Sequence, residues 1–373
     1  MIRNSAIHQL QRRTIALLED LIRTPSFSKE EDQTAAIIQA YLQEYGIATH
    51  RFLNNVWAIH PSYDVQKPTL LLNSHHDTVK PNTQYTRDPF APTIENGYLY
   101  GLGSNDAGGC LVSLLAAFVF FSSQAELPFN LVMAATAEEE ISGKNGIEAL
   151  LTSKEFLSSL HLQGPSFKRW CGIVGEPTQM NLAVAEKGLL VVDVVVEGKA
   201  GHAAREEGIN AIYKAMKDIS WIEAYRFSEI SNWLGPVKMS VTVIQTDNRA
   251  HNMVPENCTY TIDIRVNDCY THEQIIEVLQ NYLQGSIRPR SIRLRSTSID
   301  TSHPLVVAAS QLGGKPYGSP TCSDKALMPF PTLKMGPGDS ARSHTANEYI
   351  LLSEVESGIM GYIEVIGQLK PNW

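Results

Sequence analysis

Residues 69–77 read Thr-Leu-Leu-Leu-Asn-Ser-His-His-Asp, so a short apolar run leads straight into two histidines and an aspartate. The apolar part, Thr69–Leu72, predicts a buried strand. Similar runs follow at Asn130–Thr136 and Cys171–Gly175, and a helical pattern at Ala107–Phe121 lies between the first two strands. Strands that alternate with helices predict an α/β domain, with a mixed, largely parallel sheet and helices on both of its faces.

A different pattern starts after Thr178, where β-rich runs and helical patterns follow one another closely. The elements expected there are the strand Leu189–Glu197, the helix Asn210–Ala224, the strands Lys238–Gln245 and Thr259–Val266, the helix Glu273–Leu283 and the strand Ser291–Ser296. This order is typical of a small α+β sandwich. The chain then returns to the first pattern. We therefore expect a discontinuous domain of residues 1–178 and 291–373, with residues 179–290 inserted as a second domain.

Size, charge and cysteine content narrow the classes of protein. At 373 residues the chain exceeds the usual size of one hydrophobic core, which favours two domains. Its formal net charge of −8 argues against a nucleic-acid partner, which needs a basic face. The longest apolar stretch, Leu111–Phe121, is too short to span a bilayer, so no membrane partner is expected. The five scattered cysteines include no C-x-x-C pair, which indicates reduced thiols in the cytoplasm and leaves histidines and carboxylates as metal ligands.

Groups that can bind metal follow the ends of four expected strands. They are His75 after Thr69–Leu72, Glu138–Glu140 after Asn130–Thr136, Glu176 after Cys171–Gly175, and His344 beyond Pro331–Met335. A further acid, Asp106, lies in the glycine-rich turn Gly101–Gly109. Taken singly, each group has a structural alternative: a hydrogen-bonded histidine, a solvated turn, a strand end or a helix cap. Open α/β sheets place their sites beyond the carboxyl ends of the strands, so the joint pattern favours one metal site.

Two short stretches suggest how the work is divided among these groups. In His75-His76-Asp77 the first and third side chains point the same way if the backbone stays extended. Asp77 is then placed to accept a hydrogen bond from the ring of His75 and to fix its tautomer. Adjacent Glu139 and Glu140 cannot both point one way on a strand, but at a turn one can bind metal while the other faces a water molecule. This division suits hydrolysis with a general base.

The ordered motifs of the chain carry a family resemblance. They are Ser74–Val79 (SHHDTV), Gly103–Asp106 (GSND), Thr136–Glu140 (TAEEE), Val174–Thr178 (VGEPT), Gly201–Ala204 (GHAA), Asn252–Pro255 (NMVP), and the stretch from Gly336 to His344, Asn347 and Glu348. In this order they resemble the M20-type two-zinc amidohydrolases, which include acetylornithine deacetylase, succinyl-diaminopimelate desuccinylase, aminoacylase and bacterial glutamate carboxypeptidase. The resemblance covers nearly the whole chain. It implies a zinc-aminopeptidase-like catalytic domain with an inserted ferredoxin-like dimerisation domain, and therefore a homodimer.

The resemblance also implies two zinc ions, for which cobalt can substitute. Asp106 would bridge the ions, with His75 and Glu176 completing one site and Glu140 and His344 the other. Such a pair of cations acidifies a bridging water and polarises the carbonyl of an amide.

Further roles come from the same resemblance. Glu139 would be the general base, Asp77 the orienting carboxylate, and His202 the residue that reaches the partner subunit's site to steady the oxyanion. Asn252 and Arg265 look like a substrate-binding pair, although a strand arginine paired with a neighbouring acid is an equal alternative for Arg265. The family often has an arginine near the position of Lys325, so this lysine is expected to contact a substrate carboxylate or to cover the rim.

We expect an N-acyl-amino-acid deacylase similar to acetylornithine deacetylase, acting on N-acetyl- or N-succinyl-ornithine in arginine biosynthesis. Two alternatives within the same family are a di- or tripeptidase and succinyl-diaminopimelate desuccinylase. A third alternative is a catalytically inactive binding homologue. The presence of Glu139 beside every expected ligand counts against this last one, because inactive relatives tend to lose the base or a ligand.

Overall fold

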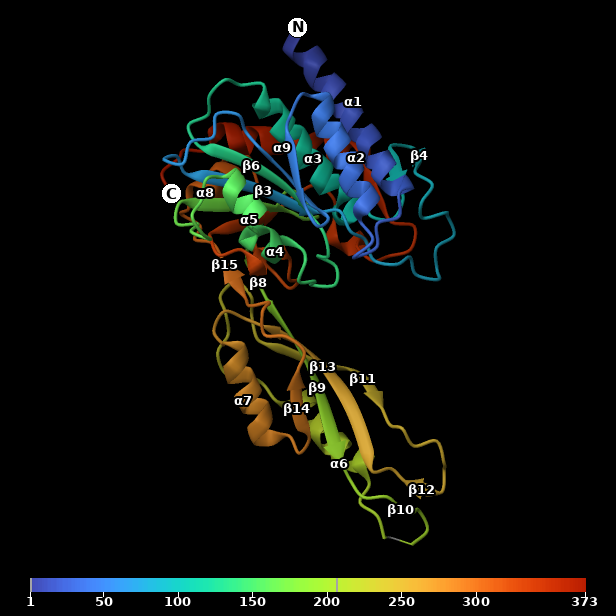
Figure 1. Ribbon diagram of the computed structural model, residues 1–373. Coiled ribbons are helices and arrows are strands. Elements are labelled where there is room, and N and C mark those ends of the chain that lie inside the picture. Colours follow the sequence, from blue (N-terminus) through green and yellow to red (C-terminus); the bar gives the residue numbers. More distant parts are fainter. Residues whose placement is uncertain (1, 206) are drawn as a thin grey trace. The chain divides into compact units, whose positions relative to one another are not determined.

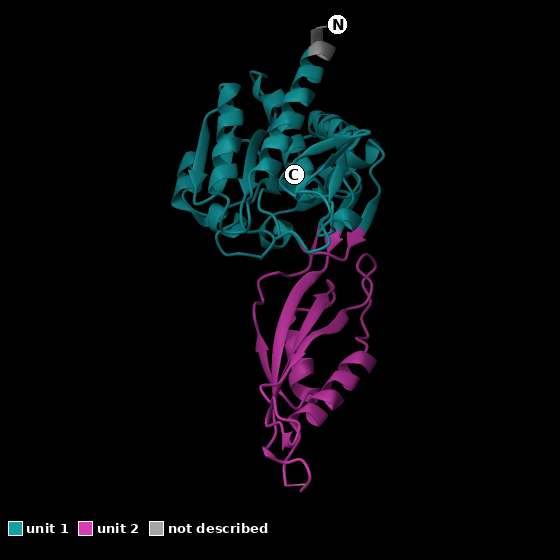
Figure 2. Ribbon diagram, turned by 90° about the vertical axis from the view of Figure 1, so that its right-hand side faces the viewer, with its two compact units in different colours: residues 1–184, 299–317, 323–373 teal, residues 185–298, 318–322 magenta. Residues whose placement is uncertain are grey.

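The computed structural model describes residues 2–205 and 207–373 (Figure 1). Two units divide the chain (Figure 2). Unit 1 comprises the described residues up to Val184 together with Ile299–Tyr317 and Ser323–Trp373, and unit 2 comprises Ala185–Ser298 and Gly318–Cys322. The chain leaves unit 1 later than the sequence indicated, because residue Ala183 of strand β8 (Leu182–Glu186) still pairs with Lys334 of the unit 1 sheet.

The centre of unit 1 is a largely parallel sheet, as the sequence predicts. Its strands lie in the order β1 (Thr49–Phe52), β2 (Asn55–Ile59), β6 (Asn130–Thr136), β3 (Thr69–His75), β7 (Trp170–Gly175), β17 (Thr332–Met335) and β8. The four strands β6, β3, β7 and β17 run parallel, while the outer pairs β1–β2, β2–β6 and β17–β8 are antiparallel. The parallel strands therefore end together at one edge of the sheet.

Both faces of this sheet are covered by helices. Leu70 and Leu72 of β3 belong to a core that includes α1 (Ile2–Arg23), α2 (Asp32–Glu44), α3 (Gly109–Ser122), α8 (Pro304–Gln311) and α9 (Leu352–Gln368). Leu71 points to the other face and belongs to a second core with α4 (Ile147–Thr152) and α5 (Lys154–Ser159). Successive side chains of a strand alternate between faces, so a continuous leucine run is what a doubly covered strand requires.

Helix α3 is the most apolar element of unit 1. By length and composition alone the stretch Ser104–Ser122 is apolar enough to cross a membrane, but 89% of this window is buried inside the protein. It packs against α1, α9 and β3, so its apolar surface is used by the core. The short helical turn η1 (Ser104–Gly108) precedes α3 and carries Asp106.

Unit 2 has the strand and helix order of a ferredoxin-like fold. Its elements are β9 (Gly188–Glu197), α6 (Ala211–Ala224), β11 (Lys238–Gln245), β13 (Asn257–Val266), α7 (His272–Tyr282) and β14 (Ser286–Pro289). They form an antiparallel sheet in the order β11-β13-β9-β14. The side chains of Asn210 and Thr271 accept hydrogen bonds from backbone N–H groups at the starts of the two helices. Such caps fix where each helix begins.

One strand of unit 2 was placed wrongly from the sequence. The alternating stretch Ser291–Ser296 predicts the last strand, whereas the structure has β14 at Ser286–Pro289. Gly285 allows the chain to turn directly from α7 onto β9, since a Cβ there would lie 2.4 Å from Cγ1 of Val194. The edge of β9 is therefore already occupied when the chain reaches residue 291.

The remaining short elements were not expected from the sequence. They are β4 (Thr93–Glu95), β5 (Tyr98–Tyr100), β10 (Gly201–His202), β12 (Met253–Val254), β15 (Thr297–Ser298), β16 (Pro316–Ser319), β18 (Tyr349–Leu351), η2 (Asp324–Leu327) and η3 (Ser340–Arg342). Runs of two to four residues give too little periodicity to be recognised.

Candidate metal centre

The expected ligands of unit 1 gather where its parallel strands end. His75 is the last residue of β3, Glu139 and Glu140 follow β6, and Glu176 follows β7. His344 lies beyond β17 in the loop after η3, with a left-handed φ of 60°. The strand ends therefore bring these side chains together from points far apart in the sequence.

The first half of the cluster surrounds the ring of His75. Its Nε2 atom lies 3.4 Å from Oδ1 of Asp106, 3.8 Å from Oε1 of Glu176 and 3.9 Å from Oε2 of Glu139. Ligand atoms of His75, Glu139 and Glu176 all lie within 4.8 Å of one another, which is close enough for one metal ion.

The second half surrounds the ring of His344. Its Nε2 atom lies 3.0 Å from Oε2 of Glu140 and 3.7 Å from Oδ2 of Asp106. Asp106 therefore presents one carboxylate oxygen to His75 and the other to His344. A carboxylate with its two oxygens directed to two histidines has the arrangement of a bridging ligand.

The hydrogen bonding of His75 shows that this cluster suits a cation. Its Nδ1 atom lies 3.0 Å from the backbone carbonyl of Asp77, and because a carbonyl only accepts, Nδ1 must carry the hydrogen. Nε2 then faces the carboxylates, is buried and has no hydrogen-bond partner. Burial alone lowers the pKa of His75, but the carboxylates of Asp106 and Asp77, each 3.4 Å from a ring nitrogen, outweigh it, so the pKa lies well above its usual value. The site attracts positive charge, and a divalent metal would supply it.

The carboxylate of Asp77 holds the turn that carries Glu139 and Glu140. The backbone N–H of Glu139 donates to Oδ1 of Asp77 and that of Glu140 to Oδ2, both at 3.1 Å. The hydroxyl of Ser28 donates to Oδ2 at 2.7 Å. The contact expected between Asp77 and the ring of His75 is longer, with 3.4 Å between Nδ1 and Oδ1. Asp77 therefore positions both His75 and the glutamate turn.

Glu138 gives this turn its shape. Its φ of 57° is left-handed, and its carboxylate accepts hydrogen bonds from the side chain and backbone of Asn145 at 2.8 and 3.3 Å. Gly143 leaves room for that carboxylate, since a Cβ there would lie 2.0 Å from Oε2 of Glu138. With Glu138 directed away, Glu139 and Glu140 are left to face the cluster.

Protonation within the cluster follows from burial and neighbouring charge. Burial raises the pKa of Glu139 well above its usual value; His75 opposes the shift and the negative charge of Glu176 adds to it. The hydrogen bond to Glu140 raises the pKa of His344 to about 9, against the effect of burial. A carboxylate with a raised pKa is suited to take up a proton and release it again near neutral pH.

Two of the expected substrate residues of unit 2 lie far apart. His202, in β10, is exposed, and its Nδ1 accepts the backbone N–H of Ala204 at 3.1 Å. Asn252 lies beside it, because its carbonyl accepts the N–H of Ala203. Arg265 lies near the far end of β13 (Asn257–Val266). At about 3.3 Å per residue it is roughly 25 Å along the strand from Asn257, the strand end that is nearer to Asn252 in the sequence. Within one chain, Asn252 therefore neighbours His202 and not Arg265.

Arg265 has a partner within its own strand. Its Nε donates to Oδ1 of Asp263 at 2.8 Å and its Nη2 to Oδ2 at 3.0 Å. This ion pair is the structural alternative considered from the sequence for this arginine.

Lys325 does not lie at a rim. Its side chain is only 1% exposed, and Nζ donates to the backbone carbonyls of Ala183 (3.2 Å) and Val184 (3.3 Å). An ammonium held inside unit 1 in this way joins η2 to β8. The expected substrate contact of Lys325 is therefore wrong, because its ammonium group is buried against two backbone carbonyls.

A neighbouring acid, Asp324, was missed from the sequence. It is 5% exposed, and its Oδ2 accepts from Nδ2 of Asn73 at 3.0 Å and from the hydroxyl of Thr136 at 2.8 Å. Burial raises the pKa of Asp324 to about 6. The carboxylate thus ties β3 to β6 beneath the two strand ends that carry His75 and the glutamate turn. Its place next to Lys325 was visible in the sequence, but its two partners were not.

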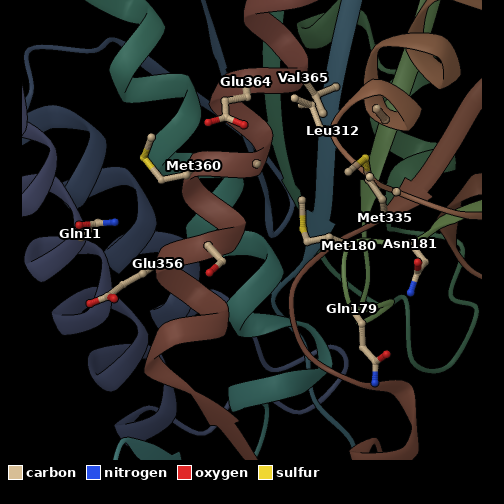
Figure 3. A pocket seen from close by; sticks show the side chains of 15 residues that line it. Gln11, Gln179, Met180, Asn181, Leu312, Met335, Glu356, Met360, Glu364 and Val365 are labelled. Atoms are coloured by element: carbon tan, nitrogen blue, oxygen red, sulfur yellow. The ribbon is translucent and has the colours of Figure 1, made fainter.

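A cavity of 570 Å³ lies elsewhere in unit 1 (Figure 3). Figure 3 shows Glu356, Met360 and Glu364 on α9, with Gln11 on one side and Met180 on the other. None of the expected metal ligands lines it. A second cavity of only 20 Å³ touches His75 and Asp106. Converging ligand atoms, and not volume, identify the candidate site.

Comparison with known proteins places the chain in a family. Residues 71–368 match peptidase family M20/M25/M40. The chain belongs to this family. Among curated relatives, the M20 chain is 26% identical to succinyl-diaminopimelate desuccinylase 2 of Ruegeria sp. (strain TM1040), over 73% of this chain and 70% of that protein. It is 30% identical to the succinyl-diaminopimelate desuccinylase of Blochmanniella floridana, over 72% of this chain and 73% of that protein.

Solved structures share the fold of the M20 chain. An M20 family metallo-carboxypeptidase from Sulfolobus solfataricus superposes with a TM-score of 0.75 at 19% identity, over 96% of this chain and 99% of that one. A dinuclear metal-binding M20 peptidase from Bacillus subtilis superposes with a TM-score of 0.67 at 18% identity, over 96% of this chain and 99% of that one. The predicted fold class, an α/β domain with an inserted α+β domain, is confirmed.

Removing the carboxylate of Asp77 should loosen the glutamate turn of the M20 chain. In Asp77→Asn an amide NH₂ faces the backbone N–H of either Glu139 or Glu140, and we expect metal affinity or activity to fall about 10- to 100-fold. Ser28→Ala is the matched control, because it removes one donor to Asp77 and leaves both backbone bonds. A zinc titration of both variants measures the effect. Equal affinity of Asp77→Asn and wild type would contradict the positioning role.

Proposed function

We propose that the M20 chain hydrolyses the amide bond of an N-acyl amino acid with two divalent metal ions, zinc in the first instance and cobalt as a substitute. The observation that carries this proposal is Asp106, whose two carboxylate oxygens are directed to His75 and to His344. In the proposed arrangement His75, Asp106 and Glu176 hold one ion, and Asp106, Glu140 and His344 hold the other. Two bound cations of this kind acidify water and polarise an amide carbonyl.

Glu139 is proposed as the general base. It lies 3.9 Å from Nε2 of His75, its neighbour Glu140 is directed to His344, and burial raises its pKa. Its carboxylate takes a proton from the attacking water as the C–O bond forms. The same proton passes to the amide nitrogen as the C–N bond breaks, which gives a carboxylic acid and a free amine. The acid then loses its own proton to the amine, so the final products are a carboxylate and an ammonium. Charge that develops on the carbonyl oxygen requires a donor from elsewhere, and we propose His202 of the partner subunit.

The relatives guide the proposed substrate. Curated proteins that are 26–30% identical are succinyl-diaminopimelate desuccinylases, so they favour an N-succinyl amino acid over the N-acetylornithine expected from the sequence. No residue of the described chain argues specifically for ornithine or for arginine biosynthesis. The nearest alternative is peptide cleavage, because solved neighbours at 15–19% identity include a dipeptidase and a tripeptidase. The complete cluster argues against the third alternative, an inactive binding homologue.

Unit 2 supports the proposed homodimer. β11 is an edge strand whose residues Val243 and Ile244 are 48% and 53% exposed. On α6, Tyr213 and Met216 are 66% and 55% exposed. An apolar strand edge beside an apolar helix face is unfavourable in water unless a second surface covers it. The proposed partner that covers this surface is a second copy of the chain.

We further propose that the substrate is a small molecule and that the protein is located in the cytoplasm.

Replacing the proposed base should separate chemistry from metal binding. Glu139→Gln keeps the size of the side chain but cannot take up a proton, so kcat should fall by roughly 10²–10⁴-fold while about two metal ions per chain remain bound. Metal content by elemental analysis and kcat on the same sample test both parts. A variant with full activity would remove the assigned role.

A substrate panel tests the proposed reaction. We expect the highest kcat/KM for N-succinyl amino acids among N-succinyl- and N-acetyl- forms of ornithine, citrulline, lysine and diaminopimelate, assayed beside simple dipeptides. Glu139→Gln, purified in the same way, controls for contaminating hydrolases. Hydrolysis of the dipeptides alone would instead establish the peptidase alternative.

Mixed dimers test whether His202 acts in trans. A His202→Ala chain and a Glu139→Gln chain, co-expressed with different tags, should each be nearly inactive alone. Their heterodimer should recover partial activity, because one of its two sites combines an intact Glu139 with the partner's intact His202. Absence of recovery in purified heterodimers would contradict action between subunits.

A further inference from the structure

Glu348 lies behind the candidate bridging ligand. It is 2% exposed, and its carboxylate accepts three backbone N–H groups from the turn that carries Asp106. Oε1 accepts from Asn105 at 2.9 Å and from Asp106 at 2.8 Å, and Oε2 accepts from Gly103 at 3.1 Å. The backbone carbonyl of Glu348 also accepts the N–H of Gly101 at 3.0 Å. One residue therefore binds the turn at four points.

The turn needs such an acceptor because of its own shape. Gly103 has a left-handed φ of 75°, and the backbone of Asp106 has non-helical angles, so the N–H groups before α3 do not point to helical partners. Buried N–H groups without an acceptor are costly. Glu348 satisfies three of them with a single side chain. It thereby fixes the backbone from which the Asp106 carboxylate extends.

The segment around Glu348 also carries a ligand of the second half of the site. His344 lies four residues earlier, and its carbonyl accepts Nδ2 of Asn82 at 3.2 Å. Between them, the side chain of Asn347 accepts the N–H groups of Thr86 and Arg87, both at 3.0 Å. Residues 344–348 are thus joined to residues 82–87 on one side and to the Asp106 turn on the other. Hydrogen bonds therefore connect the segment that carries His344 to the turn that carries Asp106.

We propose that Glu348 is a positioning residue for both metal ions: its hydrogen bonds set the Asp106 turn so that one carboxylate oxygen faces His75 and the other faces His344, where each would contribute to holding an ion. The inference rests on the proposed two-metal function. In this proposal Glu348 acts through the Asp106 turn and is not itself assigned as a ligand, because its carboxylate oxygens face the backbone N–H groups of Gly103, Asn105 and Asp106.

Glu348→Gln tests the proposal with nearly the same side-chain volume. The amide offers one oxygen and one NH₂, so in either orientation an NH₂ faces at least one backbone N–H that now donates to the carboxylate. Loss of such a supporting partner typically weakens metal binding about 10- to 100-fold. Zinc affinity of metal-free protein, measured by competition with a chelating indicator, should fall by that factor. Glu95→Gln, which alters an exposed carboxylate paired with Arg87, is the matched control and should leave the affinity unchanged.

A second variant and a folding control complete the test. Glu348→Asp keeps both oxygens but is one methylene shorter, so its zinc affinity should lie between those of wild type and Glu348→Gln; it also carries the test if Glu348→Gln does not fold. Near-ultraviolet circular dichroism of the metal-free proteins identifies the folded variants. If both variants are folded and bind zinc as tightly as wild type, the positioning role is overturned while the two-metal function stands. If wild type itself binds no metal, the proposed function falls and this inference falls with it.

Discussion

The carboxylate of Asp106 is the constraint on which the candidate site depends. One of its oxygens lies 3.4 Å from Nε2 of His75 and the other 3.7 Å from Nε2 of His344, two residues that lie 269 positions apart in the sequence. Several carboxylates this close repel one another unless positive charge lies between them. Two observations indicate that the cluster needs such positive charge: Nε2 of His75 is buried without a hydrogen-bond partner, and the pKa of Glu139 is raised. A pair of divalent cations would supply it, and the family to which the chain belongs is one of metal-dependent hydrolases.

The surrounding fold supplies rigidity at the points where the cluster needs it. The parallel strands end at one edge, and behind them buried carboxylates accept backbone N–H groups: Asp77 holds the glutamate turn and Glu348 holds the Asp106 turn. Asp324 joins β3 to β6 below. Carboxylates that bind no metal in the proposed arrangement therefore fix those that do, as supporting partners do in metal sites generally.

Much of this arrangement could be predicted from the sequence, because periodicity identifies strands and parallel strands bring their ends together. The fold class and the convergence of the groups at β3, β6 and β7 follow from that logic. Contacts between distant segments could not be predicted: the burial of Lys325 against β8, the three bonds of Glu348, and the distance between Asn252 and Arg265. The strand expected at Ser291–Ser296 was wrong for a related reason, since Gly285 lets residues 286–289 reach the edge of β9 first. Pattern alone does not decide which of two neighbouring segments reaches a sheet first.

The most direct test of the account is anomalous diffraction at the zinc edge from crystals of the zinc-loaded protein. The account predicts two zinc peaks roughly 3.5–4 Å apart, with the Asp106 carboxylate bridging them, as in other two-metal hydrolytic sites. His75 and Glu176 should contact one peak, and Glu140 and His344 the other. A single peak, or two peaks of which only one contacts Asp106, would contradict it.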